Sequence, residues 1–150
     1  MSRGEAVIGL DIGAHRIGVA RGDFEVRIAT PLPMLINSET IFEELAQLIQ
    51  ESRVEDVVIG LPRDARGQET TQSQISRDFA ARLASRSNIK IHFQDESLTS
   101  VLAEKNLRSR KGFNEKMLHD GTLDSEAATI ILQDFLDGSS NKKEARHGIV

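Results

Sequence analysis

The sequence has no cysteine, tryptophan or tyrosine among its 150 residues, and only three prolines. Without cysteine, the chain can form no disulfides, thiolate metal sites or cysteine nucleophiles. With only six phenylalanines, an extended platform for stacking single-stranded bases is not expected. The chain also lacks a signal sequence and any apolar run near the ~20 residues that cross a bilayer. We therefore expect a cytoplasmic protein.

A basic excess is missing as well, because 19 lysines and arginines stand against 23 acidic residues, for a net charge of −4. Nucleic-acid-binding domains usually carry a basic surplus, so any such binding must depend on local patches and metal ions and be salt-sensitive. The length and the 39% hydrophobic content fit one globular domain with a substantial core. We expect this domain over residues 1–138 and a flexible tail over residues 139–150.

The stretch from Val7 to Ala20 organises the rest of the chain. A short, partly β-branched apolar run ends at Asp11, turns through Gly13 and returns as a second apolar run from Ile17. This pattern predicts a buried central strand and a tight hairpin. A carboxylate on such a strand is costly unless a cation is held beside it. Asp11 is therefore a candidate metal ligand, although a lone Asp more often forms a turn.

The remaining pattern predicts an α/β fold with a mixed five-stranded sheet, three antiparallel strands followed by βα units, and helices on both faces. The third strand is expected around residues 26–29, ended by Pro31 and Pro33, because proline cannot donate to a ladder. Further strands are expected at residues 56–60 and 89–93. One helix is expected from a cap at residues 37–39 to about Arg53, and a second along Ile75, Phe79 and Leu83. A third is expected from Ser97 or Thr99 through Val101, Leu102 and Leu107, and the last from Asp124 along Ala127, Ala128 and Ile131 to Gly138. Residues 108–123 show no period and are expected to form a mobile loop.

Three acidic residues are placed by these elements at strand and helix ends. Asp11 ends the first strand, Glu96 follows the last strand, and Asp124 begins the final helix. Reactive crevices in open α/β sheets form at such strand ends. Three carboxylates without a histidine or cysteine cluster favour hard cations, Mg²⁺ or Mn²⁺. Two such ions roughly 3.5–4 Å apart can activate a water and stabilise a leaving oxygen.

Each carboxylate also has a simpler interpretation. Glu96 fits an ordinary turn, and Asp124 fits a helix cap, the commonest use of Asp before a helix. Their neighbours Asp95, Asp120 and Glu126 are rival candidates. The four histidines show no ligand spacing, so we interpret them as structural or surface residues.

Candidate phosphate-binding groups are arginines and a lysine in three segments. The segment after the strand at residues 56–60 precedes a helix start rich in Thr and Ser, and free N–H groups there could hold a phosphate. Others lie near the acidic residues or in the predicted mobile loop, where a solvated surface is the simpler interpretation. The candidates are Arg16, Arg21, Arg63, Arg66, Arg108, Arg110 and Lys111.

Four blocks of sequence together resemble the YqgF (RuvX-like) family of the RNase H-like superfamily. They are Gly9–Gly13 with Arg16–Ala20, Val58–Pro62 with Gly67, Asp95–Thr99, and Asp124–Ala128 with Ile131–Leu132. Each block alone is a weak signal, but the four stand in the family's order and spacing and span residues 7 to about 137. One departure is Ser97, where the family usually has Arg after the Asp-Glu pair.

The resemblance implies an RNase H-like fold and divalent-metal-dependent cleavage of phosphodiester bonds. By position it assigns the catalytic and metal-binding acids to Asp11, Glu96 and Asp124. It further implies maturation of precursor 16S ribosomal RNA, with contact to the small-subunit precursor, as a monomer or homodimer. Holliday junction resolution is the alternative within the same chemistry, and would need a dimer that presents two sites.

Two other classes remain as alternatives. Sugar kinases and actin-like ATPases share an Asp-x-Gly hairpin, but they need two such domains, and 150 residues hold one. A non-catalytic ribosome-associated module could also have this fold. The presence of all three acids favours the enzyme over that module.

Overall fold

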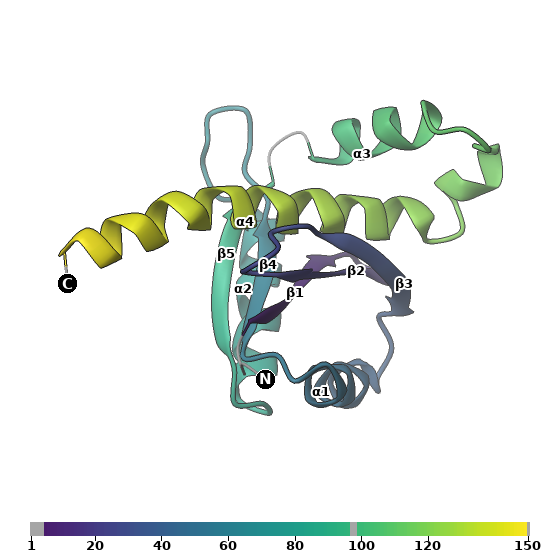
Figure 1. Cartoon of the computed structure of the whole chain (residues 1–150). Helices are drawn as coiled ribbons and strands as arrows, with labels where there is room; N and C mark the ends of the chain where they lie inside the picture. Colours follow the sequence, from purple (N-terminus) through teal and green to yellow (C-terminus); the bar gives the residue numbers. More distant parts are fainter. Residues whose placement is uncertain (1–4, 97–98, 150) are drawn as a thin grey trace.

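The computed structural model describes residues 5–96 and 99–149, with side chains through residue 138. Its centre is a five-stranded sheet in the order β3-β2-β1-β4-β5 (Figure 1). Strands β1 (Ala6–Ile12), β2 (Arg16–Asp23) and β3 (Thr30–Ile36) are antiparallel, whereas β4 (Asp56–Leu61) and β5 (Lys90–Asp95) run parallel to β1. The mixed sheet and its antiparallel meander at one end are confirmed.

Helices cover both faces of this sheet, as expected. Helices α1 (Ile41–Ser52) and α2 (Thr71–Ala84) lie on one face, while α4 (Thr122–Ile149) crosses the other, with α3 (Thr99–Arg108) packed against α4 (Figure 1). In the described part of the chain, no helix is long and apolar enough to span a membrane.

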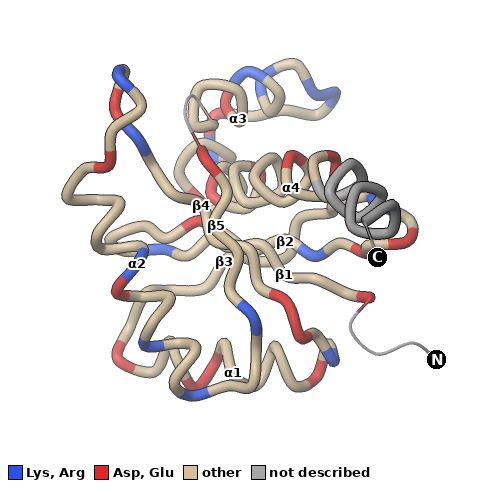
Figure 2. The backbone as a smooth tube through the Cα atoms, turned by 90° about the vertical axis from the view of Figure 1, so that its left-hand side faces the viewer, with Lys and Arg blue, Asp and Glu red and all other residues tan. Residues whose placement is uncertain are grey.

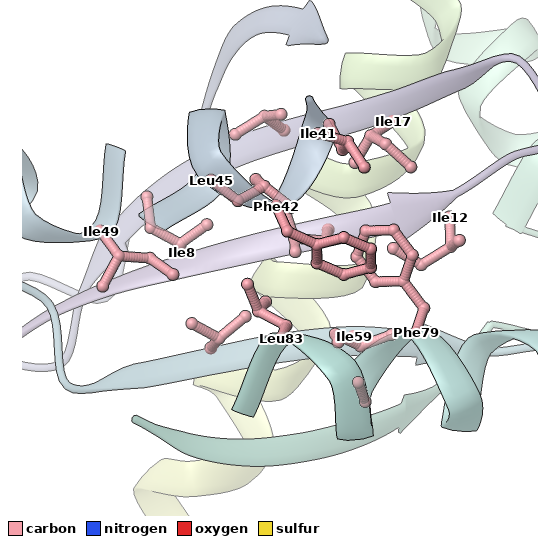
Figure 3. Close-up of a cluster of buried hydrophobic side chains, with 14 of the residues drawn as sticks. Ile8, Ile12, Ile17, Ile41, Phe42, Leu45, Ile49, Ile59, Phe79 and Leu83 are labelled. Atoms are coloured by element: carbon pink, nitrogen blue, oxygen red, sulfur yellow. The ribbon is translucent and has the colours of Figure 1, made fainter. Parts of the chain in front are cut away.

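The two faces of β1 build two separate cores because side chains alternate along a strand. Ile8 and Leu10 join the larger cluster, where Phe42 of α1 and Phe79 of α2 stack 4.7 Å apart (Figure 3). Val7 belongs to the cluster under α4. Asp11 follows Val7 by four residues and therefore lies on the α4 face of the sheet.

The third strand was predicted in the wrong place. Residues 26–29 form no strand, and β3 instead begins at Thr30 and contains both Pro31 and Pro33. Proline is tolerated there because β3 is the edge of the sheet and pairs only with β2. Val26, at the start of the predicted strand, is 65% exposed.

Residues 108–123 are not the structureless loop that was predicted. A 3₁₀ helix, η1 (Glu115–Leu118), lies within them, and α4 begins at Thr122, just before Asp124, where the final helix was expected to start. Arg110 from this segment bonds Glu126 on α4 at 2.8 Å. The small polar residues and glycines of this segment do not predict a regular structure. Its stabilising contacts are to α4, which is distant in the sequence.

Helix ends and faces also differ from the predictions. α1 has Thr40 as its N-cap instead of residues 37–39, and α4 continues past Gly138 to Ile149. Ile75, Val101 and Leu102 are exposed, and smaller residues take their expected buried places, namely Ser73 and Ser76 on α2 and Thr99 and Ala103 on α3. Ser97, the other proposed cap, lies outside the described residues. A domain boundary near residue 138 and a flexible tail stay predictions.

Candidate active site

Asp11 lies near the end of the central strand β1, opposite Gly18 of β2. Its side chain is on the sheet face covered by α4. Burial raises the pKa of Asp11 to about 6, a hydrogen bond with Glu96 lowers it, and the charge of Asp124 raises it further. Asp11 therefore lies on a strand as predicted, and both Glu96 and Asp124 influence its pKa.

Glu96 follows β5 and reaches Asp11 across the intervening strand β4. A Cβ atom at Gly60 of β4 would lie only 2.8 Å from Glu96 Oε2, so this glycine leaves the space that the Glu96 side chain occupies. Burial, the charge of Asp11 and the shared hydrogen bond raise the pKa of Glu96 to about 8. The pKa values of both groups are raised, so the pair retains a proton at pH values where isolated carboxyl groups are ionised.

Asp124 lies in the first turn of α4, directly above the Asp11–Gly18 pair. A Cβ atom at Gly18 would lie 1.9 Å from the Asp124 carbonyl oxygen, so the helix backbone touches the sheet there. Asp124 Oδ2 is 3.5 Å from Arg16 Nη1. The structure therefore brings Asp124 near Asp11, and the Asp124 carboxylate forms an ion pair with Arg16.

The three carboxylates fit a hard cation, although they do not form a closed set of ligands. Across the side chains that the structure describes, the acidic group whose ligand atoms all lie within 4.8 Å is a different one, Glu5, Asp23 and Glu25. That group is at the opposite end of β1 from Asp11, and exposed acids commonly cluster without an ion. Asp11 and Glu96, in contrast, are half-buried and hydrogen-bonded to each other, and an oxygen-only donor set of this kind suits Mg²⁺ or Mn²⁺.

A pocket of about 300 Å³ opens over Asp11 and Glu96. Arg63 lines one side, and Gln72 of α2 and Ser100 of α3 complete its polar rim. Gln72 also donates to the Ile12 carbonyl oxygen at 3.3 Å, which ties α2 to the end of β1. Sequence reasoning missed Gln72 and Ser100, since neither belongs to a motif and only the fold brings them to the site.

The segment carrying Arg63 and Arg66 forms a small hairpin beside this pocket, visible as the loop projecting before α2 (Figure 1). Arg63 pairs with Glu69 in an antiparallel bridge and donates to the Gly67 carbonyl oxygen at 3.1 Å. Asp64 Oδ1 accepts the backbone N–H groups of Arg66 and Gln68 at 2.9 Å. The N-terminus of α2 is capped by Thr70 and Ser73, and this capping box occupies the backbone N–H groups of both residues. Phosphate binding by Arg63 and Arg66 stays a prediction.

The other predicted cations are scattered. Arg21 pairs with Ile8 in the sheet and therefore lies on the face opposite Asp11. Arg108 contacts Glu104 at 3.0 Å and Glu115 at 3.3 Å, and Arg110 is held by Glu126 as described above. Lys111 is exposed. Figure 2 shows basic segments on the hairpin before α2 and on the chain around and after α3, at the same end of the molecule.

The rival acids have other roles in the structure. Asp120 accepts hydrogen bonds from the Thr122 backbone and hydroxyl group, and so caps α4 in place of Asp124. Glu126 is buried against Arg110. Asp95 pairs with Leu61 and lies on the sheet face away from α4. Of the histidines, His92 bonds Asp56 at 2.8 Å and packs on Phe135, a structural role as expected.

The family model described as "RuvX: Holliday junction resolvase" matches residues 5–138. The chain belongs to the RuvX family. Its relatives include proteins named as candidate pre-16S rRNA nucleases. The one from Sulfurihydrogenibium sp. is 40% identical and covers 93% of this chain and 94% of its own. The one from Synechocystis sp. is 37% identical, and the match covers 91% of this chain and 90% of that protein.

Solved structures confirm the RNase H-like fold of this RuvX chain. T. thermophilus RuvC in complex with a Holliday junction substrate matches with a TM-score of 0.54 at 15% identity, covering 90% of this chain and 95% of that one. The fowlpox virus resolvase matches with a TM-score of 0.55 at 13% identity, covering 89% and 99%. Family membership and fold were both predicted correctly from the four sequence blocks.

Proposed function

We propose that this RuvX chain is a divalent-metal-dependent endonuclease that matures the 5′ end of precursor 16S ribosomal RNA. The observation that carries the proposal is the half-buried, hydrogen-bonded Asp11–Glu96 pair with Asp124 beside it. Buried carboxylates are held together at a cost unless a proton or a cation offsets their repulsion. The names of the relatives at 37–40% identity support the choice of RNA.

Asp11, Glu96 and Asp124 would hold the Mg²⁺ or Mn²⁺ ions. When bound, such ions activate a water for attack on phosphorus and stabilise charge on the leaving oxygen. Asp11 supplies the ionised oxygen at the floor of the pocket, because the hydrogen bond from Glu96 favours its charged form. Glu96 must release its proton before it can act as an anionic ligand.

The substrate backbone would lie along the pocket between the hairpin and α3. Arg63 lines this pocket beside Asp11 and Glu96, and its neighbour Arg66 extends the basic surface along the hairpin. Lys111 adds an exposed charge after α3. Arg108 and Arg110 would have to leave acidic partners to bind phosphate. Because Arg16, Arg108 and Arg110 have acidic partners, a ribosomal small-subunit precursor would contribute much of the affinity, in the cytoplasm.

Holliday junction cleavage is the second candidate, because the matching family is described as a Holliday junction resolvase. The same carboxylates would perform that hydrolysis, but a junction needs two sites in a homodimer. A monomer suffices for the RNA reaction. The two candidates therefore differ in substrate and assembly and share their chemistry.

The test compares a precursor 16S rRNA fragment with a synthetic four-way DNA junction, each with Mn²⁺ and with chelator. We expect metal-dependent cleavage of the RNA at a defined position. Symmetric nicking of the junction, with the RNA left intact, would replace the rRNA proposal with the resolvase. Absence of cleavage on both, with RNA binding retained, would favour a non-catalytic ribosome-associated module.

A further inference from the structure

The guanidinium group of Arg16 lies against the start of α4, and both of its terminal nitrogens have partners. Nη2 donates to the His119 carbonyl oxygen at 2.6 Å, just before the helix. Nη1 lies 3.5 Å from Asp124 Oδ2. Arg16 also contributes, after the hydrogen bonds from Thr122, to lowering the pKa of Asp120. The positive charge of Arg16 therefore acts on the start of α4 and on the acidic residues there, Asp120 and Asp124.

Asp124 lies between this arginine and the Asp11–Glu96 carboxyl pair. Arg16 and Gly18 share one face of β2, and Gly18 stands opposite Asp11. The Asp124 backbone contacts the sheet at Gly18. The Asp124 side chain therefore leaves the helix between Arg16 and Asp11. The charge of Asp124 reaches Asp11, where it adds to the pKa rise that burial causes, yet its oxygen contacts Arg16.

We propose that Arg16 is a resident counter-ion for Asp124, which holds this carboxylate in place and competes with a divalent cation for it. The inference rests on the proposed metal-dependent function. Two cations cannot neutralise the same carboxylate fully, so binding of one weakens the other by linkage. Arg16 is therefore a positioning residue. The sequence had instead suggested that Arg16 binds phosphate.

The size of the competition follows from the exposure of the pair. The Arg16 and Asp124 side chains are 36% and 32% exposed, so solvent screens their attraction. Ion pairs of this kind change an equilibrium constant by about two- to fivefold. Loss of the Arg16 charge should therefore tighten binding of a divalent cation at Asp124 by about that factor.

The first experiment uses the unmodified protein and needs no cleavage. The side-chain Nε–H signal of Arg16 is followed by ¹⁵N NMR during titration with diamagnetic Mg²⁺. We expect this signal to shift with the occupancy of the site, whereas the Arg21 signal stays unchanged because Arg21 lies on the opposite sheet face. An Arg16 signal unchanged at saturating Mg²⁺ overturns the proposal, because Asp124 would then serve both partners at once.

The second experiment measures Mn²⁺ affinity by isothermal titration calorimetry in Arg16→Gln and Arg16→Lys. Gln removes the charge but can still donate to the His119 carbonyl oxygen, and Lys keeps the charge. We expect Mn²⁺ to bind about two- to fivefold more tightly to Arg16→Gln, and within twofold of the original affinity to Arg16→Lys. Arg21→Gln, the same change on the same strand, should leave the affinity unchanged.

The outcomes separate this inference from the proposed function. Equal or weaker Mn²⁺ binding in a folded Arg16→Gln protein would show that Arg16 does not compete with the ion. If Arg16→Gln does not fold, the NMR titration decides the question alone. If the unmodified protein binds neither Mg²⁺ nor Mn²⁺, the proposed nuclease function is wrong, and the inference about Arg16, which depends on it, is wrong as well.

Discussion

The carboxyl groups of Asp11 and Glu96 share a hydrogen bond across Gly60, the glycine of the strand between them. β1 and β5 are not neighbours in the sheet, so their acids meet only because β4 has no side chain at that point. The site thus depends on an absent side chain as much as on the two that are present.

Replacing Gly60 tests this relationship. In Gly60→Ala, the new methyl group would lie 2.6 Å from Ile131 Cδ1 and 2.8 Å from Glu96 Oε2. Both are ends of flexible side chains, so the fold should persist with a loss of about 1–3 kcal/mol in the free energy of unfolding. Displacement of Glu96 should lower the cleavage rate by about 100-fold. Urea unfolding and a cleavage assay measure the two effects.

Gly138→Ala is the matched control, because among the described residues no atom outside the surrounding helix backbone lies within 4 Å of the added methyl group. It should raise stability by about 0.5–1 kcal/mol through helix propensity and leave cleavage unchanged. Equal cleavage rates for Gly60→Ala and the original chain would contradict the role given to the space beside Glu96.

The shared proton predicts how stability depends on pH without metal. The pKa of Glu96 is about 8 in the folded chain, above its ordinary value of 4.5, and that of Asp11 is raised in the same direction. The folded state therefore binds more protons than the unfolded state in this window, so the free energy of unfolding falls as the pH rises from about 4.5 to about 8. Each kcal/mol lost lowers Tm by about 2–4 °C in a domain of this size.

Thermal unfolding in chelator at a pH near 5.5 and a pH near 8.5 measures this effect. Tm should be lower at the higher pH, and Mn²⁺ should restore it there because a cation replaces the shared proton. Glu96→Gln should show a smaller pH dependence over the same range. A Tm that rises with pH in the unmodified protein would contradict the assigned proton.

Arg110 and Lys111 should behave differently although they are adjacent. Arg110→Ala leaves the Glu126 carboxylate, 7% exposed, without its partner, and should cost about 2–3 kcal/mol of unfolding free energy. Adding Glu126→Gln should recover part of that loss. Lys111→Ala should change stability by less than about 0.5 kcal/mol. Chemical denaturation that ranks both single variants alike would refute this distinction.

The hairpin arginines are expected to act on nucleic acid without affecting the fold. Arg66→Ala should weaken RNA binding and reduce the slope of log K against log salt by about 1, since one phosphate contact is lost. Its stability should stay unchanged, because the hairpin is held by Asp64 and by the pairing of Arg63 with Glu69. Filter binding at several salt concentrations gives the slope, and an unchanged slope would exclude Arg66 from the interface.

The sequence was sufficient for a mixed sheet with three antiparallel strands, and it selected three acids that the fold brings near one another. Their catalytic role stays a prediction. Asp11 ends an apolar run, and Glu96 and Asp124 stand at the ends of elements, so topology alone brings them to one edge. β3 was misplaced since proline is excluded only from inner strands, and local pattern does not show which strand is the edge.

The partners of the arginines could not be predicted in the same way. Arg16 and Arg110 contact α4 residues far away in the chain, at Asp124 and Glu126, and no local pattern encodes such pairs. The residues that make room, Gly18 and Gly60, looked like ordinary strand glycines. Their function depends on what packs over them, which only the three-dimensional structure shows.

The most direct test of the account is metal-dependent cleavage of a precursor 16S rRNA fragment by Asp11→Asn. Asn is nearly isosteric with Asp, so the fold should be retained, as judged by Tm and circular dichroism. Glu25→Gln, which alters the separate acidic group near the other end of β1, is the control. We predict that the original chain and Glu25→Gln cut the RNA with Mn²⁺ and not with chelator, and that Asp11→Asn does not cut it. Normal cleavage by a folded Asp11→Asn protein would contradict the assignment of this site.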